Sequence, residues 1–261
     1  MTEPIRYAVV EGIATITFSR PQVMNALDPQ SIIAFRAVCE RAAHDTQARV
    51  VVLRGEGAAF LAGGDVASFK DNLADFSAKA AALTGELHHG ILALRRAPKP
   101  VIASVHGAVA GAGMSIMLAC DLILAAEGTQ FTMAYSRIGA SPDGGASWFL
   151  PRLMGYQKAM ELLLLSDVID TAALQALGVI YRVWPAAALA DATQKLAQRL
   201  AAGPATAYAE TKALVNYKQN QILAEHLEAE AQAFSRCAAH PDFAEGVTAF
   251  VEKRKALFKH D

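Results

Sequence analysis

The feature that most constrains the fold of this chain is a set of three short apolar runs, each separated from the next by a segment with helical spacing. They are RVVVLRGEG at 49–57, KPVIASVHG at 99–107 and DLILAAE at 121–127. Each run has the length and the apolar character of a buried strand. Strands that alternate with helices in this way predict a mainly parallel sheet with helical crossovers, which is an α/β fold.

A different strand signal precedes these runs. The stretch IRYAVVEGIATITFS, at 5–19, contains two β-rich segments broken at EG and predicts a hairpin. Apolar residues recur at helical spacing between the strands. Helices are therefore predicted over about 28–43, 78–96 and 111–121.

The C-terminal part lacks strand signals after about residue 195. Pro204 and Pro241 each stand where a helix could begin, because proline is tolerated in the first helical turn. Helical spacing covers 204–219, 221–239 and 241–258. We therefore divide the chain into a core, 1–200, and a helical region, 201–261, that folds over the core or packs against a neighbouring subunit.

Composition excludes several classes of function. The net charge is −1 and no basic stripe is present, so nucleic acid is not an expected partner. Asp121 and Glu161 interrupt the longest apolar runs, so no membrane span is expected. The N-terminus, MTEPIRYAVVEG, lacks the pattern of a secretory signal, which favours the cytoplasm. Hydrophobic residues make up 53% of the chain, which is compatible with surface hidden in an oligomer.

The cysteines do not indicate a metal centre. Cys39, Cys120 and Cys237 are widely spaced and odd in number, which suits reduced thiols better than disulfides or zinc ligands. We therefore expect no metal site.

Two glycine-rich turns follow the first two apolar runs. They are FLAGGD at 60–65 and HGAVAGAG at 106–113. A dinucleotide fingerprint is incomplete, because Ile116 stands where its third glycine would be. The turns could be ordinary strand-to-helix connections. Alternatively, the amides of Gly64 and Ala112 could converge on one carbonyl oxygen and form an oxyanion hole, although spacing alone does not establish that the turns meet.

A family resemblance joins these features. The segments FLAGGD, KPVIASVHGAVAGAG, ACDLILAAEGTQF and IGASPDGGASWFLPRLMG, with RPQVMNALD and FVEKRKALF near the ends, resemble the crotonase (enoyl-CoA hydratase/isomerase) superfamily over almost the whole chain. The resemblance implies a spiral of ββα units with a C-terminal helical region that supports a homotrimer or homohexamer. It also implies an acyl-CoA thioester as substrate, with coenzyme A as part of that substrate and no separate cofactor.

The resemblance assigns the binding residues. It places Gly64 and Ala112 at the oxyanion-hole positions, and the backbone of Ala62, Gly63, Asp65 and Val66 along the coenzyme A. Many members have glycine where this chain has Ala112. Because the donor is the backbone N–H, alanine can serve there if its φ is negative.

The number of carboxylates at the family's catalytic positions indicates which reaction to expect. Family hydratases use two glutamates, and this chain has Ser115 and Tyr135 at those positions, so efficient hydration is not expected. Asp143 matches the single acid/base of several family isomerases, and PDGG followed by W.LPRL.G resembles the epoxyphenylacetyl-CoA isomerases. One carboxylate suffices for isomerisation, because it removes a proton α to the thioester and its conjugate acid returns the proton two carbons away. We expect Ser115, Tyr135 and His88 to contact the substrate.

Three alternatives remain open. An Asp just before a small-residue helix start is a favoured N-cap, so Asp143 could be structural. The 4-chlorobenzoyl-CoA dehalogenases place an aspartate nucleophile at the position of Asp143 and a histidine base at that of His88, but a tryptophan at that of Tyr135. The chain could also bind CoA esters with little turnover. Tyr135, Trp148 and Phe149 are candidates for the lining of an acyl pocket.

Overall fold

The computed structural model describes residues 3–70, 73–217 and 219–258. Its main sheet has six strands in the order β1-β2-β3-β4-β6-β9. The first pair is antiparallel and the remaining pairs are parallel, so the predicted hairpin and mainly parallel sheet are confirmed. The strands are β1 (Ile5–Val10), β2 (Ile13–Phe18), β3 (Val50–Gly55), β4 (Val101–Val105), β6 (Leu122–Ala126) and β9 (Arg182–Trp184).

A second, three-stranded sheet carries the chain away from the main one. It comprises β5 (Ala108–Ala110), β7 (Gln130–Thr132) and β8 (Ile169–Asp170), in the order β5-β7-β8. The chain passes from β4 to β5 through Gly107, whose φ is +63°, and a Cβ there would lie 1.8 Å from the Ala58 oxygen. Only glycine fits this turn, which directs β5 toward the segment that follows β3.

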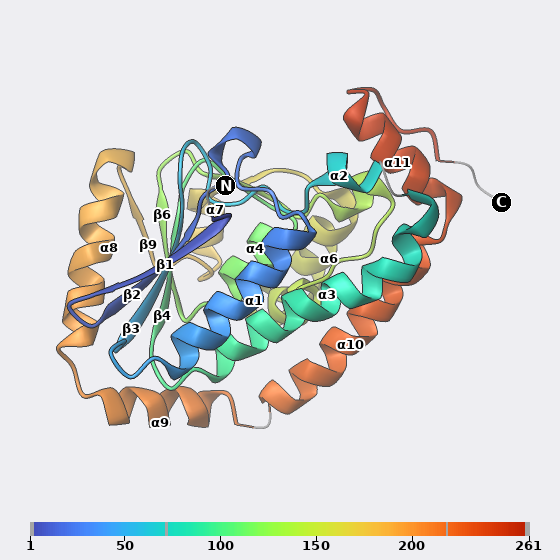
Figure 1. Cartoon of the computed structure of the whole chain (residues 1–261). Coiled ribbons are helices and arrows are strands. Elements are labelled where there is room, and N and C mark those ends of the chain that lie inside the picture. The colour runs from blue at the N-terminus through green and yellow to red at the C-terminus, as the bar shows by residue number, and fades with distance from the viewer. Residues whose placement is uncertain (1–2, 71–72, 218, 259–261) are drawn as a thin grey trace.

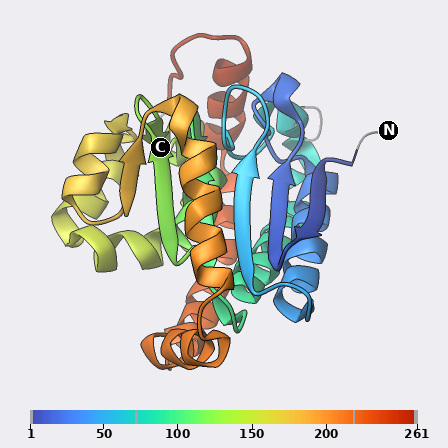
Figure 2. The same cartoon turned by 90° about the vertical axis from the view of Figure 1, so that its left-hand side faces the viewer.

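Helices cover both faces of the main sheet. The helix α8 (Ala186–Ala201) packs against one face (Figure 2). Val50 and Val52 share a hydrophobic cluster with residues of α8 on that face. Val51 and Leu53 belong to the larger hydrophobic core on the other face, because side chains alternate along a strand. That face is covered by α1 (Pro29–His44) and α3 (Leu73–Arg96), with α10 (Gln219–Ala238) packed against α3 (Figure 1).

The C-terminal helices pack against the same chain. After α9 (Ala205–Val215) and α10, α11 (Pro241–Val251) lies against α2 (Val66–Lys70) and the 3-10 helix η2 (Tyr135–Ile138). The contact between α11 and η2 is backbone to backbone, because a Cβ on Gly246 would lie 2.6 Å from the carbonyl carbon of Ile138. Side chains of α10 and α11 therefore enter the main hydrophobic core. They are Leu223, Leu227, Phe234, Ala238, Phe243 and Val247.

Several helix boundaries differ from the sequence prediction. The helix α4 (Ala112–Leu118) ends before residue 121, because the Asp121 carboxylate accepts the Val101 N–H at 2.8 Å and ties the chain to β4. The last helix stops at Val251 rather than near residue 258, since Lys253 has a φ of +54°. The remaining helices are η1 (Pro21–Val23), α5 (Ala146–Met154), α6 (Tyr156–Leu165) and α7 (Thr171–Ala176).

In the described part of the chain, no helix is both long and apolar enough to cross a membrane.

Candidate active site

The two glycine-rich turns meet. Leu61 forms a parallel bridge with Val109, in which the Leu61 oxygen accepts the Ala110 N–H at 3.0 Å. This bridge brings Gly63 against the start of α4: its φ is +90°, and a Cβ there would lie 3.6 Å from the Ala112 nitrogen. The convergence that spacing alone left open is therefore present in the fold.

Both proposed oxyanion donors have free N–H groups in the described structure. Leu27 bridges the Gly64 segment by donating to the Gly63 oxygen at 2.8 Å and accepting the Asp65 N–H at 2.9 Å, which leaves the Gly64 N–H outside that bridge. Ala112 is the first residue of α4, where N–H groups have no helical partner. Among the described residues, Ala112 is not one of those with positive φ, so alanine is compatible with this position.

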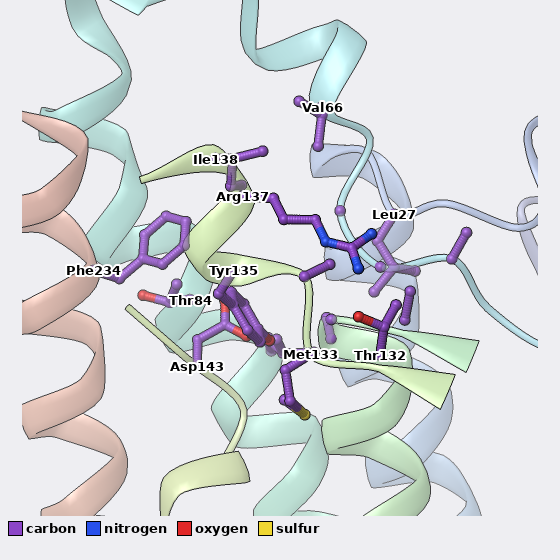
Figure 3. Close-up of a pocket in the computed structure, with 18 of the residues that line it drawn as sticks. Leu27, Val66, Thr84, Thr132, Met133, Tyr135, Arg137, Ile138, Asp143 and Phe234 are labelled. Carbon is purple, nitrogen blue, oxygen red and sulfur yellow. The ribbon is translucent and has the colours of Figure 1, made fainter. Parts of the chain in front are cut away.

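A cavity of about 290 Å³ joins these amides to Asp143. Asp143 and Tyr135 are almost fully buried, whereas Met24 and Phe250 are more than half exposed, so the carboxylate lies deep and the mouth is near the latter pair. Figure 3 shows Asp143 and Tyr135 side by side. The wall is mostly apolar and includes Leu27, Ile32, Ala62, Gly63, Gly64, Val66, Leu83, Leu87, Ala112, Met133, Ile138 and Phe234.

Asp143 has the properties of a proton shuttle. Burial disfavours the carboxylate and raises the pKa of Asp143 to about 7; the Tyr135 hydrogen bond opposes this shift and the negative charge of Glu230 adds to it. The Tyr135 hydroxyl donates to Asp143 Oδ1 at 2.5 Å. Among the described residues, no hydrogen bond uses Oδ2. A carboxyl that titrates near neutral pH can both accept and return a proton.

The interpretation of Asp143 as an N-cap is wrong. The cap position of α5 is Gly145, which lacks a side chain, and the Asp143 side chain turns to Tyr135 instead. The capping carboxylate is Glu230 of α10. Its Oε2 accepts the Gly145 N–H at 2.7 Å, and its Oε1 accepts the Ser147 N–H at 3.2 Å. A residue distant in the sequence thus supplies the acceptor that local pattern assigned to Asp143.

Ser115 and His88 support the segment that carries Asp143. Ser115 Oγ donates to the Asp143 backbone oxygen at 2.8 Å, and His88 Nε2 accepts the Gly144 N–H at 3.1 Å. Burial lowers the pKa of His88 to about 4, so its ring is neutral at pH 7. Of the three polar residues expected to contact substrate, Tyr135 lines the cavity, whereas Ser115 and His88 are not among its lining residues.

Of the residues expected to lie along coenzyme A, some line the cavity and one does not. Ala62, Gly63 and Val66 line the cavity, as does Gly64. Asp65 is not among the lining residues: its carboxylate pairs with Arg20 at 3.1 Å, and the same Arg20 Nη2 lies 3.1 Å from Asp28. This pairing anchors the segment beside the start of α1.

Sequence analysis missed Arg137 and Glu230. The exposed side chain of Arg137 enters the cavity from η2 (Figure 3), donates to the Ser166 oxygen and has no carboxylate partner among the described residues. A single arginine in AYSRIG carries no sequence signal for this role. Trp148 and Phe149 do not line this cavity; they line a second one of about 540 Å³ beside α9.

The described residues contain no group of three or more His, Cys, Asp or Glu side chains placed to hold a metal ion.

Comparison with known proteins identifies the class. A family model described as enoyl-CoA hydratase/isomerase matches residues 9–261. The chain belongs to this family, and the resemblance to the crotonase superfamily is confirmed.

Its relatives carry more than one activity. The chain is 36% identical to a probable enoyl-CoA hydratase of Rhodobacter capsulatus, over 97% of both chains. It is 33% identical to a 1,2-epoxyphenylacetyl-CoA isomerase of Escherichia coli, over 99% of both. A crystal structure of an enoyl-CoA hydratase from Mycobacterium avium subsp. paratuberculosis matches with a TM-score of 0.89 and 32% identity, over 98% of this chain and 99% of that one. The family is therefore established, and the particular reaction has to be argued from the site.

Proposed function

We propose that this protein is an enoyl-CoA isomerase that shifts a double bond, or opens an equivalent ring, through an enolate. One observation carries the proposal: among the described residues, Asp143 is the single carboxylate that lines the cavity shared by the Gly64 and Ala112 amides. A single acid/base group facing an oxyanion hole is the minimum machinery for moving a proton between two carbons.

The reaction follows from this arrangement. The thioester oxygen of a 3-enoyl-CoA accepts hydrogen bonds from the Gly64 and Ala112 N–H groups, which stabilise the charge that develops there. Asp143 Oδ2 removes a proton from the carbon α to the thioester and gives a dienolate. The protonated carboxyl then returns the proton two carbons away, so the double bond moves into conjugation and Asp143 is regenerated.

The site is less suited to hydration. The side chains at the positions of the hydratase glutamates are Ser115 and Tyr135, and the latter has a pKa well above its ordinary value because it is buried beside Asp143. Neither can hold and activate water as a carboxylate does at neutral pH. We therefore propose that 2-enoyl-CoA is hydrated weakly or not at all.

Hydrolytic dehalogenation is the second candidate. It requires Asp143 to attack an aryl carbon and a base at the position of His88 to activate water. In this chain the Gly144 N–H occupies the acceptor nitrogen of His88, which is absent from the cavity lining. This geometry favours the isomerase over the dehalogenase.

The test is a panel of 3-enoyl-CoA, 2-enoyl-CoA and 4-chlorobenzoyl-CoA with identification of products. We expect turnover of 3-enoyl-CoA alone. The isosteric variant Asp143→Asn should lose nearly all turnover while it keeps the affinity for the CoA ester. Release of chloride from 4-chlorobenzoyl-CoA would support the dehalogenase, and absence of turnover with all three substrates would support a binding protein. Full activity of Asp143→Asn would show that Asp143 is not the catalytic acid/base.

We also propose assembly as a homotrimer or homohexamer. Large apolar side chains are exposed at the end of α9 and just beyond it, at Leu214, Val215 and Tyr217. Burial of such a patch against another copy is its simplest use. Light scattering coupled to size-exclusion chromatography measures the assembled mass, and a monomer would contradict the proposal.

A further inference from the structure

A buried carboxylate from the C-terminal region lies against the start of α5. Glu230, on α10, is almost fully buried. Besides the Gly145 and Ser147 N–H groups, it accepts the Ser147 hydroxyl at 2.5 Å. Three donors from one short segment therefore converge on one carboxylate, which is favoured at a helix N-terminus by charge and by hydrogen bonding.

The segment it contacts needs an external anchor. Gly144 and Gly145 have φ values of +64° and +85°, and neither offers a side chain to hold the loop. A Cβ on Gly144 would lie 2.7 Å from the Ser115 Cβ, so the loop also lies too close to α4 for a larger residue. Glycines are flexible when nothing fixes them, and Asp143 directly precedes this pair.

Three elements fix the loop from different sides. Ser115 of α4 donates to the Asp143 oxygen, and His88 of α3 accepts the Gly144 N–H. Glu230 of α10 accepts the Gly145 N–H, so three backbone groups in two consecutive peptide units are each held by a different helix. Glu230 is the charged member of this set and comes from the part of the chain most distant in sequence.

We propose that Glu230 is a positioning residue: it holds the 143–147 loop so that Asp143 faces the reactive carbons. The inference rests on the proposed isomerase function. A negative charge near a buried carboxyl opposes its ionisation, so Glu230 acts on Asp143 through both geometry and charge. It does not line the cavity and so is not a catalytic residue in the described structure.

Other titratable groups face this pair. His226, one turn before Glu230 on α10, lies 2.6 Å from Ser147 Oγ and 3.6 Å from Glu230 Oε1. From η2, Tyr135 contacts Asp143, and His88 faces the loop from α3. The neutral His88 adds no charge at pH 7.

The test compares Glu230→Gln with Glu225→Gln, an exposed glutamate on the same helix. The first change keeps the size of the side chain but removes its charge and one acceptor oxygen. We expect kcat to fall about 10- to 100-fold, the loss typical of a misplaced catalytic group, with KM nearly unchanged. The midpoint of the pH–rate curve should also move to lower pH, because removing a negative charge eases ionisation of Asp143. Glu225→Gln should match the wild type in both.

The result separates the two proposals. If Asp143→Asn abolishes turnover but Glu230→Gln keeps the wild-type kcat and pH midpoint, only the positioning role is wrong. If Asp143→Asn keeps full turnover, the proposed function itself fails.

If circular dichroism shows that Glu230→Gln does not fold, Ser147→Ala provides the second measurement. It removes the hydroxyl contact to Glu230 and leaves the N–H contacts. A several-fold lower kcat with unchanged KM would support the positioning role, and an unchanged kcat would overturn it.

Discussion

Replacement of Tyr135 by Phe removes one hydroxyl and leaves the ring that lines the cavity. That hydroxyl donates to Asp143 Oδ1 at 2.5 Å and lowers the pKa of this carboxyl against the effect of burial. A hydrogen bond to a charged group contributes about 1.5–3 kcal/mol, and about 1.4 kcal/mol corresponds to one pH unit. The variant should therefore shift the midpoint of the pH–rate curve upward by about one to two pH units.

The loss of kcat/KM in Tyr135→Phe should be larger at neutral pH than at high pH. The wild-type Asp143, with a pKa of about 7, is half ionised at pH 7 and able to accept a proton. With a midpoint one unit higher, about a tenth of the variant is ionised at pH 7, so kcat/KM should fall about fivefold there. If the shift is one unit, the two enzymes should converge at pH 9 and above. Tyr135 itself adds no step in this range, because its pKa is raised well above the ordinary value.

The assay is kcat/KM for a 3-enoyl-CoA between pH 5 and pH 9.5, with Tyr156→Phe as the control. Tyr156 is exposed on α6 and outside the cavity, so its loss should leave the curve unchanged. A Tyr135→Phe midpoint at or below that of the wild type would show that this hydroxyl does not stabilise the ionised carboxylate.

Three further changes test other parts of the site. Ala112→Pro removes the proposed oxyanion donor at the first position of α4, where proline is tolerated. We expect kcat to fall about 10²- to 10³-fold with an unchanged melting temperature, whereas the control Ala112→Gly should stay active. An active proline variant would exclude this amide as a donor. His88→Gln keeps an acceptor for the Gly144 N–H, so its turnover of 3-enoyl-CoA should remain within about twofold of the wild-type value. Loss of 4-chlorobenzoyl-CoA hydrolysis in this variant would instead indicate a dehalogenase. Below about pH 6.5 the lowered pKa of His88 gives both the wild type and Asp143→Asn a stability that rises with pH. Because burial raises the pKa of Asp143 to about 7, the folded state alone holds its proton between about pH 4 and pH 7, and the contribution of Asp143 to stability should decrease as pH rises through this window. In urea unfolding, Asp143→Asn should remove this slope and gain up to about 4 kcal/mol at pH 8 but little at pH 4; equal slopes in both proteins would contradict the raised pKa.

The sequence predicted those helices and strands whose formation depends on residues close together in the chain. The hairpin at 5–18 and the buried strands β3, β4 and β6 were predictable from short apolar or β-rich runs bounded by turns. The strands of the second sheet are two or three residues long, too short to show any period, and none was predicted. Helix α4 ended early because of a contact between the Asp121 side chain and another strand, which no propensity describes.

The same distinction holds for the site. Local sequence and family resemblance drew attention to Gly64, Ala112 and Asp143, and the structure brings all three to one cavity. The cap of α5 was misassigned, because its acceptor, Glu230, lies 85 positions along the chain from the Gly145 N–H that it binds. Arg137 was missed since an isolated arginine looks like any solvated side chain until its surroundings are known.

The close packing of α11 on η2 has a consequence for synthesis of the enzyme. The cavity wall draws on residues from Met24 to Phe250, and the last of these stands on α11. A nascent chain still missing this helix lacks one wall of the pocket and the backbone that rests on Ile138. The wall of the cavity is therefore complete only after α11 has been synthesised and has packed on η2.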